Sequence, residues 1–296
     1  MYDKVIAFGD SFVSGDELSQ ELIPNLQQEV INFFGVDMEI HGDVKLPEKK
    51  FSYADYNRWR STVLEKYDPG AETAKKLSYA GQIADHYNAE FYNFAYPGFS
   101  MSSIYATVIK NLSLITPDSL VIVGLTFPDR ITRFRPYYIE CEPGRRFSKN
   151  KDHAKYIELD VEYGNDIITR LMWVQTIIES IKSIVKCKRI IFIDPVNIYR
   201  ENPEIEKFQY FTVDRIVENH INMETIDDSI IEDIISTHLD IITYLKEYFN
   251  RELFPYTFAH SIERLLKTNQ KVKCILGHPS YIVHRDFVEN CLIPEL

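Results

Sequence analysis

Four short apolar runs, separated by stretches with helical periodicity, constrain the fold of this 296-residue chain most strongly. The runs are Lys4–Phe8, Glu90–Phe94, Ser119–Gly124 and Arg189–Asp194, and each is rich in Val, Ile or Phe and closes near Gly, Pro or Asp. A weaker fifth run covers Lys271–Leu276. Strands that alternate with helices predict an α/β fold with a doubly wound parallel sheet.

Two of the intervening stretches have apolar side chains at helical spacing. Residues 71–88 place Ala74, Leu77, Ile83 and Ala84 roughly on one face, and residues 166–186 form a stronger amphipathic pattern. In a doubly wound sheet, ligands bind beyond the carboxyl ends of the strands. Three turns fall at such ends: Gly9–Ser11, Tyr96–Ser100 and Thr126–Arg130. The sequence therefore predicts that these turns converge on one site.

Three segments are longer than simple connections, and we interpret the chain as one domain, residues 1–296, with insertions. The insertions lie at about 16–69, 135–160 and 200–266; residues 135–160 have the character of a surface loop, and residues 200–266 are expected to be mostly helical. They could cap the strand ends, or they could serve peripheral packing or an oligomer contact. We expect at least one of Asp16–Pro69 and Arg200–Leu266 to wall the pocket at Ser11.

Charge and cysteine content exclude several classes of function. The formal net charge is −11 and there is no block of Lys and Arg, so neither nucleic acid nor a membrane surface is an expected partner. The chain has four cysteines, at Cys141, Cys187, Cys274 and Cys291. They are far apart and form no CxxC pair, which argues against zinc and redox motifs and favours free thiols. Without a visible signal peptide, we expect a soluble cytoplasmic protein.

The stretch VIAFGDSFVSGDE, residues 5–17, places Ser11 at the turn between a buried strand and a helix. A serine there is either a helix cap or a nucleophile. It acts as a nucleophile only where a base and oxyanion donors converge on it. Asp10 beside it is more readily explained as a structural residue that binds backbone N–H groups of the turn.

The rest of the chain supplies partners for Ser11. Gly98, in FYNFAYPGFSMSSI, lets its backbone N–H approach a ligand closely. Thr126, in LVIVGLTFPDRITRF, either donates its hydroxyl to an oxyanion or caps the next turn, with Asp129 and Arg130 beside it. His278, in CILGHPSYIVHRDFVENCL, is a general base at a strand end or a structural histidine, and His284 is its rival.

In order and context, these segments resemble the blocks of the SGNH hydrolases, also called the GDSL family. FGDSF matches the Gly-Asp-Ser block, and NFAYPGFS matches the glycine block through Gly98. The resemblance implies a flavodoxin-like three-layer α/β/α sandwich and hydrolysis of esters, thioesters or carbohydrate acetyl groups without metal or organic cofactor. It also implies that Ser11 is the nucleophile, His278 the base, and the N–H groups of Ser11 and Gly98 oxyanion donors.

Two departures separate the chain from the family pattern. Thr126 stands where the family has the Asn of Gly-x-Asn-Asp, a substitution that we associate with a divergent, phage-like branch. Ile275 stands three residues before His278, where the family has Asp. The chain is therefore expected to use a Ser–His pair, unless a carboxylate such as Asp286 or a backbone carbonyl orients the imidazole.

The sequence thus predicts a serine hydrolase of the esterase or carbohydrate-deacetylase type that acts on a small-molecule or glycan ester. Two alternatives stay open. One is a degenerate SGNH-fold protein that only binds its ligand, and the other is an O-acyltransferase that uses the same serine. A phage-derived chain could also be associated with a virion.

Overall fold

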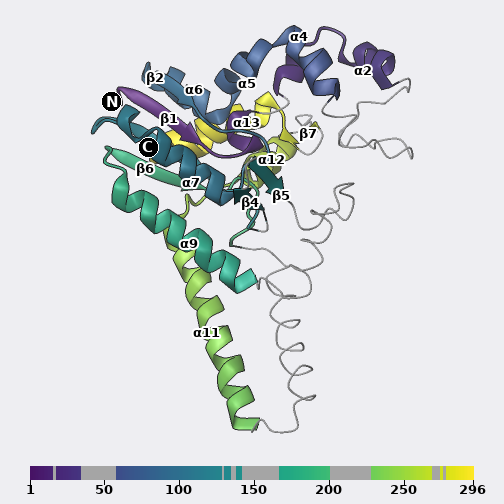
Figure 1. Ribbon diagram of the computed structural model, residues 1–296. Coiled ribbons are helices and arrows are strands. Elements are labelled where there is room, and N and C mark those ends of the chain that lie inside the picture. Colours follow the sequence, from purple (N-terminus) through teal and green to yellow (C-terminus); the bar gives the residue numbers. More distant parts are fainter. Residues whose placement is uncertain are drawn as a thin grey trace.

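The centre of the computed structural model is a parallel sheet of four strands in the order β2-β1-β3-β6 (Figure 1). The strands are β1 (Lys4–Phe8), β2 (Glu90–Asn93), β3 (Leu120–Gly124) and β6 (Arg189–Ile193). All four strands predicted from the sequence are confirmed, with ends within one residue of those expected. The structure describes residues 1–15, 18–34, 58–128, 130–134, 138–141, 167–200, 228–268, 274–275 and 278–296.

The strand order decides where a ligand site can form. Because β1 lies between β2 and β3, the chain winds outward in opposite directions from the β1–β3 pair. A crevice forms beyond the carboxyl ends of the strands at such a switch point. The turns that begin at Gly9 and at Leu125 follow these two strands directly.

Helices cover both faces of the sheet, which explains why its strands are apolar runs without alternation. On one face, Ile6, Phe8 and Val123 share a core with α7 (Met101–Lys110), α9 (Ile167–Ile184) and α11 (Asp228–Glu252). Helix α9 confirms the helix predicted at residues 166–186. Figure 1 shows α7 and α9 beside the sheet and α11 extending well beyond it.

The other face packs against a different set of helices. Val5, Ala7 and Ile122 share a core with α6 (Tyr79–Tyr87), α12 (Phe258–Lys267) and α13 (Tyr281–Phe287). The predicted helix at residues 71–88 is in fact two, α5 (Glu72–Leu77) and α6. Ser78 separates them because its hydroxyl caps α6, accepting the Gly81 N–H at 3.3 Å.

The fifth predicted strand, Lys271–Leu276, is wrong as a member of the parallel sheet. Its described part, β7 (Cys274–Ile275), pairs antiparallel with β8 (His278–Pro279). Ile275 pairs with His278 and Cys274 with Pro279, so both described residues of this run belong to an antiparallel pair outside the parallel sheet.

The described parts of the predicted insertions include helices and strands. In the first, η1 (Leu18–Leu22) is followed by a small core around Ile23, Trp59 and Val63. In the next, β5 (Tyr138–Cys141) pairs with β4 (Ile131–Phe134), and residues 142–160 lie outside the described ones. The remaining elements are α1 (Ser11–Ser14), α2 (Leu26–Phe34), η2 (Arg60–Leu64), α4 (Glu65–Tyr67), η3 (Pro69–Ala71), η4 (Leu112–Leu114), η5 (Val288–Leu292) and η6 (Ile293–Glu295). None of the helices in the described ranges is both long and apolar enough to cross a membrane.

Candidate active site

Ser11 and His278 lie together although 267 residues separate them in the chain. The Ser11 Oγ is 2.7 Å from the His278 Nε2, a hydrogen-bond distance. Ser11 is the first residue of α1, directly beyond the carboxyl end of β1, and His278 begins β8. The structure therefore brings together the two residues that sequence reasoning paired, with a separation suited to proton transfer.

The His278 ring packs against an aromatic side chain that sequence analysis did not single out. The Phe12 ring lies 4.9 Å from it between centroids, and Phe258 of α12 lies 6.3 Å behind Phe12. Phe12 and Phe258 are both buried. Phe12 follows the serine in the FGDSF block, so its position next to Ser11 was visible, but its contact with His278 depends on the tertiary fold.

Two strand-end glycines allow α1 to sit tightly on the sheet. A Cβ at Gly9 would lie 2.2 Å from the Val13 Cγ2, and one at Gly124 would lie 2.1 Å from the same atom. Both distances are far below van der Waals contact, so the Val13 side chain occupies the space that these glycines leave open. This packing fixes the helix that carries Ser11 against the ends of β1 and β3.

Backbone donors are available next to Ser11. Within the described ranges, neither the Ser11 N–H nor the Gly98 N–H makes a hydrogen bond. Gly98 has a φ of 86°, which favours glycine, and the Tyr96 N–H donates to the Gly9 carbonyl at 3.1 Å. That bond ties the loop that contains Gly98 to the turn that carries Ser11.

Asp10 links the turn after β1 to the turn after β3. Its side chain is fully buried; Oδ1 accepts the Phe12 N–H at 3.1 Å, and Oδ2 accepts the Arg130 guanidinium at 2.8 Å. Burial raises the pKa of the Asp10 carboxyl, and the charge of Arg130 opposes that rise. The contacts fit the structural role expected for Asp10, and Arg130 supports it.

Thr126 is not placed to act as the predicted oxyanion donor. Its hydroxyl donates to the Asp10 Oδ2 at 2.9 Å and accepts from Arg130 at 2.8 Å. A hydroxyl has a single hydrogen, and here that hydrogen is used by Asp10. The expectation is therefore corrected: Thr126 braces Asp10. Asp129, the other supporting residue predicted in this turn, lies outside the described residues.

His284, the rival base, is enclosed in the core. Its Nδ1 accepts the Tyr79 N–H at 3.0 Å, and its ring stacks on Tyr79 and packs against Phe258. Burial, with a smaller contribution from the charge of His278, lowers the pKa of His284 to about 3. His284 is therefore a neutral structural residue that caps the start of α6.

This burial predicts how stability depends on pH. The unfolded chain protonates His284 below its ordinary pKa of about 6.5, whereas the folded chain does so only near 3. As the pH is lowered from about 6.5 to about 3, this group alone should therefore lower the free energy of unfolding by about 1.4 kcal/mol per pH unit. The variant His284→Gln keeps an acceptor for the Tyr79 N–H but has no imidazole to protonate. When the free energy of unfolding is measured with urea between pH 7 and 4, it should depend less steeply on pH in this variant than in the unmodified chain. Parallel curves for the two proteins would contradict this assignment.

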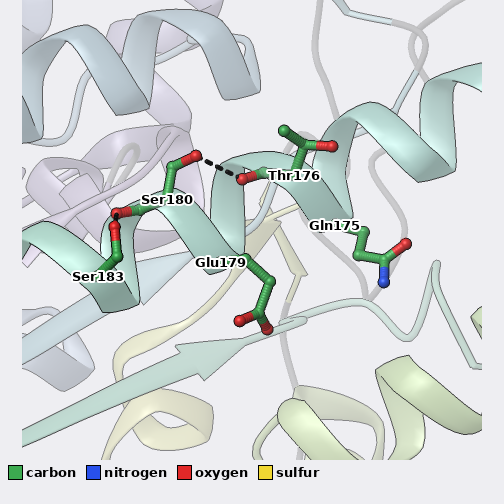
Figure 2. A pocket seen from close by; sticks show the side chains of 5 residues that line it. All are labelled: Gln175, Thr176, Glu179, Ser180 and Ser183. Carbon is green, nitrogen blue, oxygen red and sulfur yellow. Dashed lines mark hydrogen bonds between the residues drawn. The ribbon is translucent and has the colours of Figure 1, made fainter.

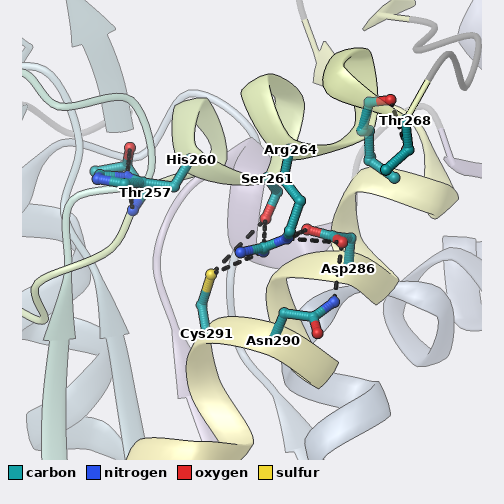
Figure 3. Close-up of polar contacts among 9 residues, drawn as sticks. Thr257, His260, Ser261, Arg264, Thr268, Asp286, Asn290 and Cys291 are labelled. Atoms are coloured by element: carbon teal, nitrogen blue, oxygen red, sulfur yellow. Dashed lines mark hydrogen bonds and ion pairs between the residues drawn. The ribbon is translucent and has the colours of Figure 1, made fainter.

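Asp286 does not orient the imidazole of His278. Figure 3 shows its carboxylate turned toward Arg264, whose Nη2 lies 2.6 Å from Oδ2 and whose Nε lies 3.1 Å from both oxygens. Asn290 adds a further bond at 2.9 Å. The suggestion that Asp286 replaces the missing family Asp is therefore corrected, because its oxygens are used by Arg264 and Asn290.

Two surface depressions away from Ser11, formed by described residues, contain no serine–histidine pair of this kind. The depression in Figure 2 lies along α9, where the Ser180 and Ser183 hydroxyls bond to carbonyls of their own helix and Glu179 accepts from Tyr248. Another depression lies along α12 and includes Arg264. No group of three or more His, Cys, Asp or Glu side chains in the described part of the chain is arranged to hold a metal ion.

Comparison with known proteins identified no relative of this chain. No protein-family model, curated protein or solved structure matches the chain.

Proposed function

We propose that this chain is a serine hydrolase that cleaves an ester, with Ser11 as nucleophile and His278 as general base. The observation that carries the proposal is the 2.7 Å separation of the Ser11 Oγ and the His278 Nε2 at the carboxyl edge of a parallel sheet. A flavodoxin-like α/β/α sandwich of the SGNH type is part of this proposal, supported by the strand order and the helices on both faces.

The proposed reaction has two halves. The Ser11 Oγ attacks the ester carbonyl carbon while the His278 Nε2 takes the hydroxyl proton, and the N–H groups of Ser11 and Gly98 stabilise the oxyanion. The intermediate collapses to an acyl-serine, and the imidazolium returns its proton to the departing alcohol. Water then attacks the acyl group with the same base, which releases the carboxylic acid and restores Ser11.

The site predicts slow turnover compared with a full triad and three donors. With the Thr126 hydroxyl bonded to Asp10, two backbone donors remain, and a lost donor costs about 10²–10³ in rate.

The bond of Thr126 to Asp10 also favours another candidate function, a protein of this fold that binds an ester-bearing small molecule or glycan without cleaving it. In both cases we propose a soluble protein without a nucleic-acid or membrane partner.

Acetate release separates the candidates. The purified chain with p-nitrophenyl acetate and no added acceptor should release both p-nitrophenol and acetate repeatedly, since water completes the cycle. If the chain releases a single burst of p-nitrophenol and turns over repeatedly only when an alcohol is added, the chain is an acyltransferase and not a hydrolase. Saturable binding of the ester with no burst would favour the binding protein.

A further inference from the structure

Glu21 reaches from the first insertion to the segment that carries His278. Its Oε1 accepts the Tyr281 N–H at 2.7 Å, across 260 residues of chain. Tyr281 lies three residues after His278 and is the first residue of α13. The bond therefore joins η1 to the histidine segment itself.

Tyr281 needs an acceptor from outside its own helix. The first N–H groups of a helix have no intrahelical partner and are usually capped by the residue before them. Here that residue, Ser280, makes no side-chain cap, and its buried hydroxyl forms no hydrogen bond within the described ranges. Glu21 supplies the acceptor that the local sequence does not.

Glu21 is itself exposed, but the residues of η1 from which it extends are buried and hydrogen-bonded. Leu18, Ser19 and Gln20, the preceding residues of η1, are all buried. The Ser19 hydroxyl donates to Asp68 at 2.8 Å, and Asp68 also accepts the Ala74 N–H at 2.8 Å. Because η1 is fixed in this way, its bond to Tyr281 can hold the histidine segment in place.

The geometry points to Glu21 as a positioning residue for His278, acting through the Tyr281 N–H. This inference rests on the proposed hydrolase function. The chain has Ile275 three residues before His278, where the family has Asp, and Tyr281, whose N–H binds Glu21, lies three residues after it. A displacement of about 1 Å at a catalytic group can cost about 10²-fold in rate.

Variants of the full chain test this, with p-nitrophenyl acetate as substrate. Glu21→Ala should lower kcat by about 10- to 100-fold with little change in KM, because ester binding does not use this bond. Glu21→Gln should recover most of the rate, since its amide oxygen still accepts. Glu29→Ala, which removes a carboxylate of the same insertion that binds Tyr67, should behave like the unmodified chain. Tyr281→Pro removes the donor at a position that suits proline, because it opens a helix and Ser280 before it is extended.

A double variant, Glu21→Ala with Tyr281→Pro, distinguishes a positioning role of Glu21 from a general loss of stability. If one bond is responsible, Glu21→Ala with Tyr281→Pro should be no slower than either single variant, and Tyr281→Ala, which keeps the N–H, should be nearly normal. Additive losses, or full activity in Glu21→Ala while Ser11→Ala is inactive, would overturn the role of Glu21 and leave the hydrolase proposal intact. If Glu21→Ala does not fold, Tyr281→Pro with its alanine control gives the same decision. An unmodified chain without esterase activity would contradict the hydrolase proposal instead.

Discussion

Ser11→Ala is expected to abolish hydrolysis of p-nitrophenyl acetate while leaving the fold unchanged. The alanine variant has no oxygen to attack the carbonyl, so the reaction loses its first step. Ser11 follows the N-cap Asp10, and the cap bond of Asp10 to Phe12 does not involve the serine hydroxyl. The free energy of unfolding of the Ser11→Ala variant should therefore differ from that of the unmodified chain by no more than about 1 kcal/mol, the scale of a lost cap.

The matched control for this variant is Ser14→Ala. Ser14 lies on the same short helix, and its hydroxyl donates to the Ser11 carbonyl at 3.1 Å. It should retain hydrolysis, with circular dichroism and urea unfolding reporting the fold of both variants. Full activity in Ser11→Ala would end the hydrolase proposal, and loss of activity in both variants with loss of structure would show that the helix, rather than the serine, was disturbed.

His278→Ala is expected to lower kcat/KM by about 10²–10⁴-fold, the usual contribution of a general base. His284→Gln is its control, because it alters the neighbouring histidine but keeps the acceptor for Tyr79. It should turn over ester at nearly the normal rate at pH 7. If His284→Gln loses activity and His278→Ala keeps it, the base has been assigned to the wrong residue.

The sequence was informative about the sheet for a physical reason. Parallel strands covered on both faces are short, apolar and closed by turn residues, so β1 and β3 were visible as patterns. Ser11 follows β1 directly, but His278 was paired with it through the resemblance to the SGNH blocks, and the sheet strand expected before His278 is instead part of the antiparallel pair β7–β8.

Other features depended on contacts that no local pattern specifies. A threonine hydroxyl donates to an oxyanion or to a carboxylate according to what lies within about 3 Å, and for Thr126 that group is Asp10. Asp286 was close to the histidines in sequence, but Arg264 from α12 binds it. Glu21 lies in a polar insertion with no motif around it, and only the packing of η1 brings it to Tyr281.

The most direct test of the central claim is to treat the purified chain with a fluorophosphonate and map the adduct by mass spectrometry. A serine activated by a base displaces fluoride and forms an O–P bond, whereas a helix-capping serine does not react at a comparable rate. The account predicts one adduct per chain, located at Ser11, absent from Ser11→Ala and formed much more slowly in His278→Ala. An unlabelled chain, or an adduct at another residue that persists in Ser11→Ala, would contradict it.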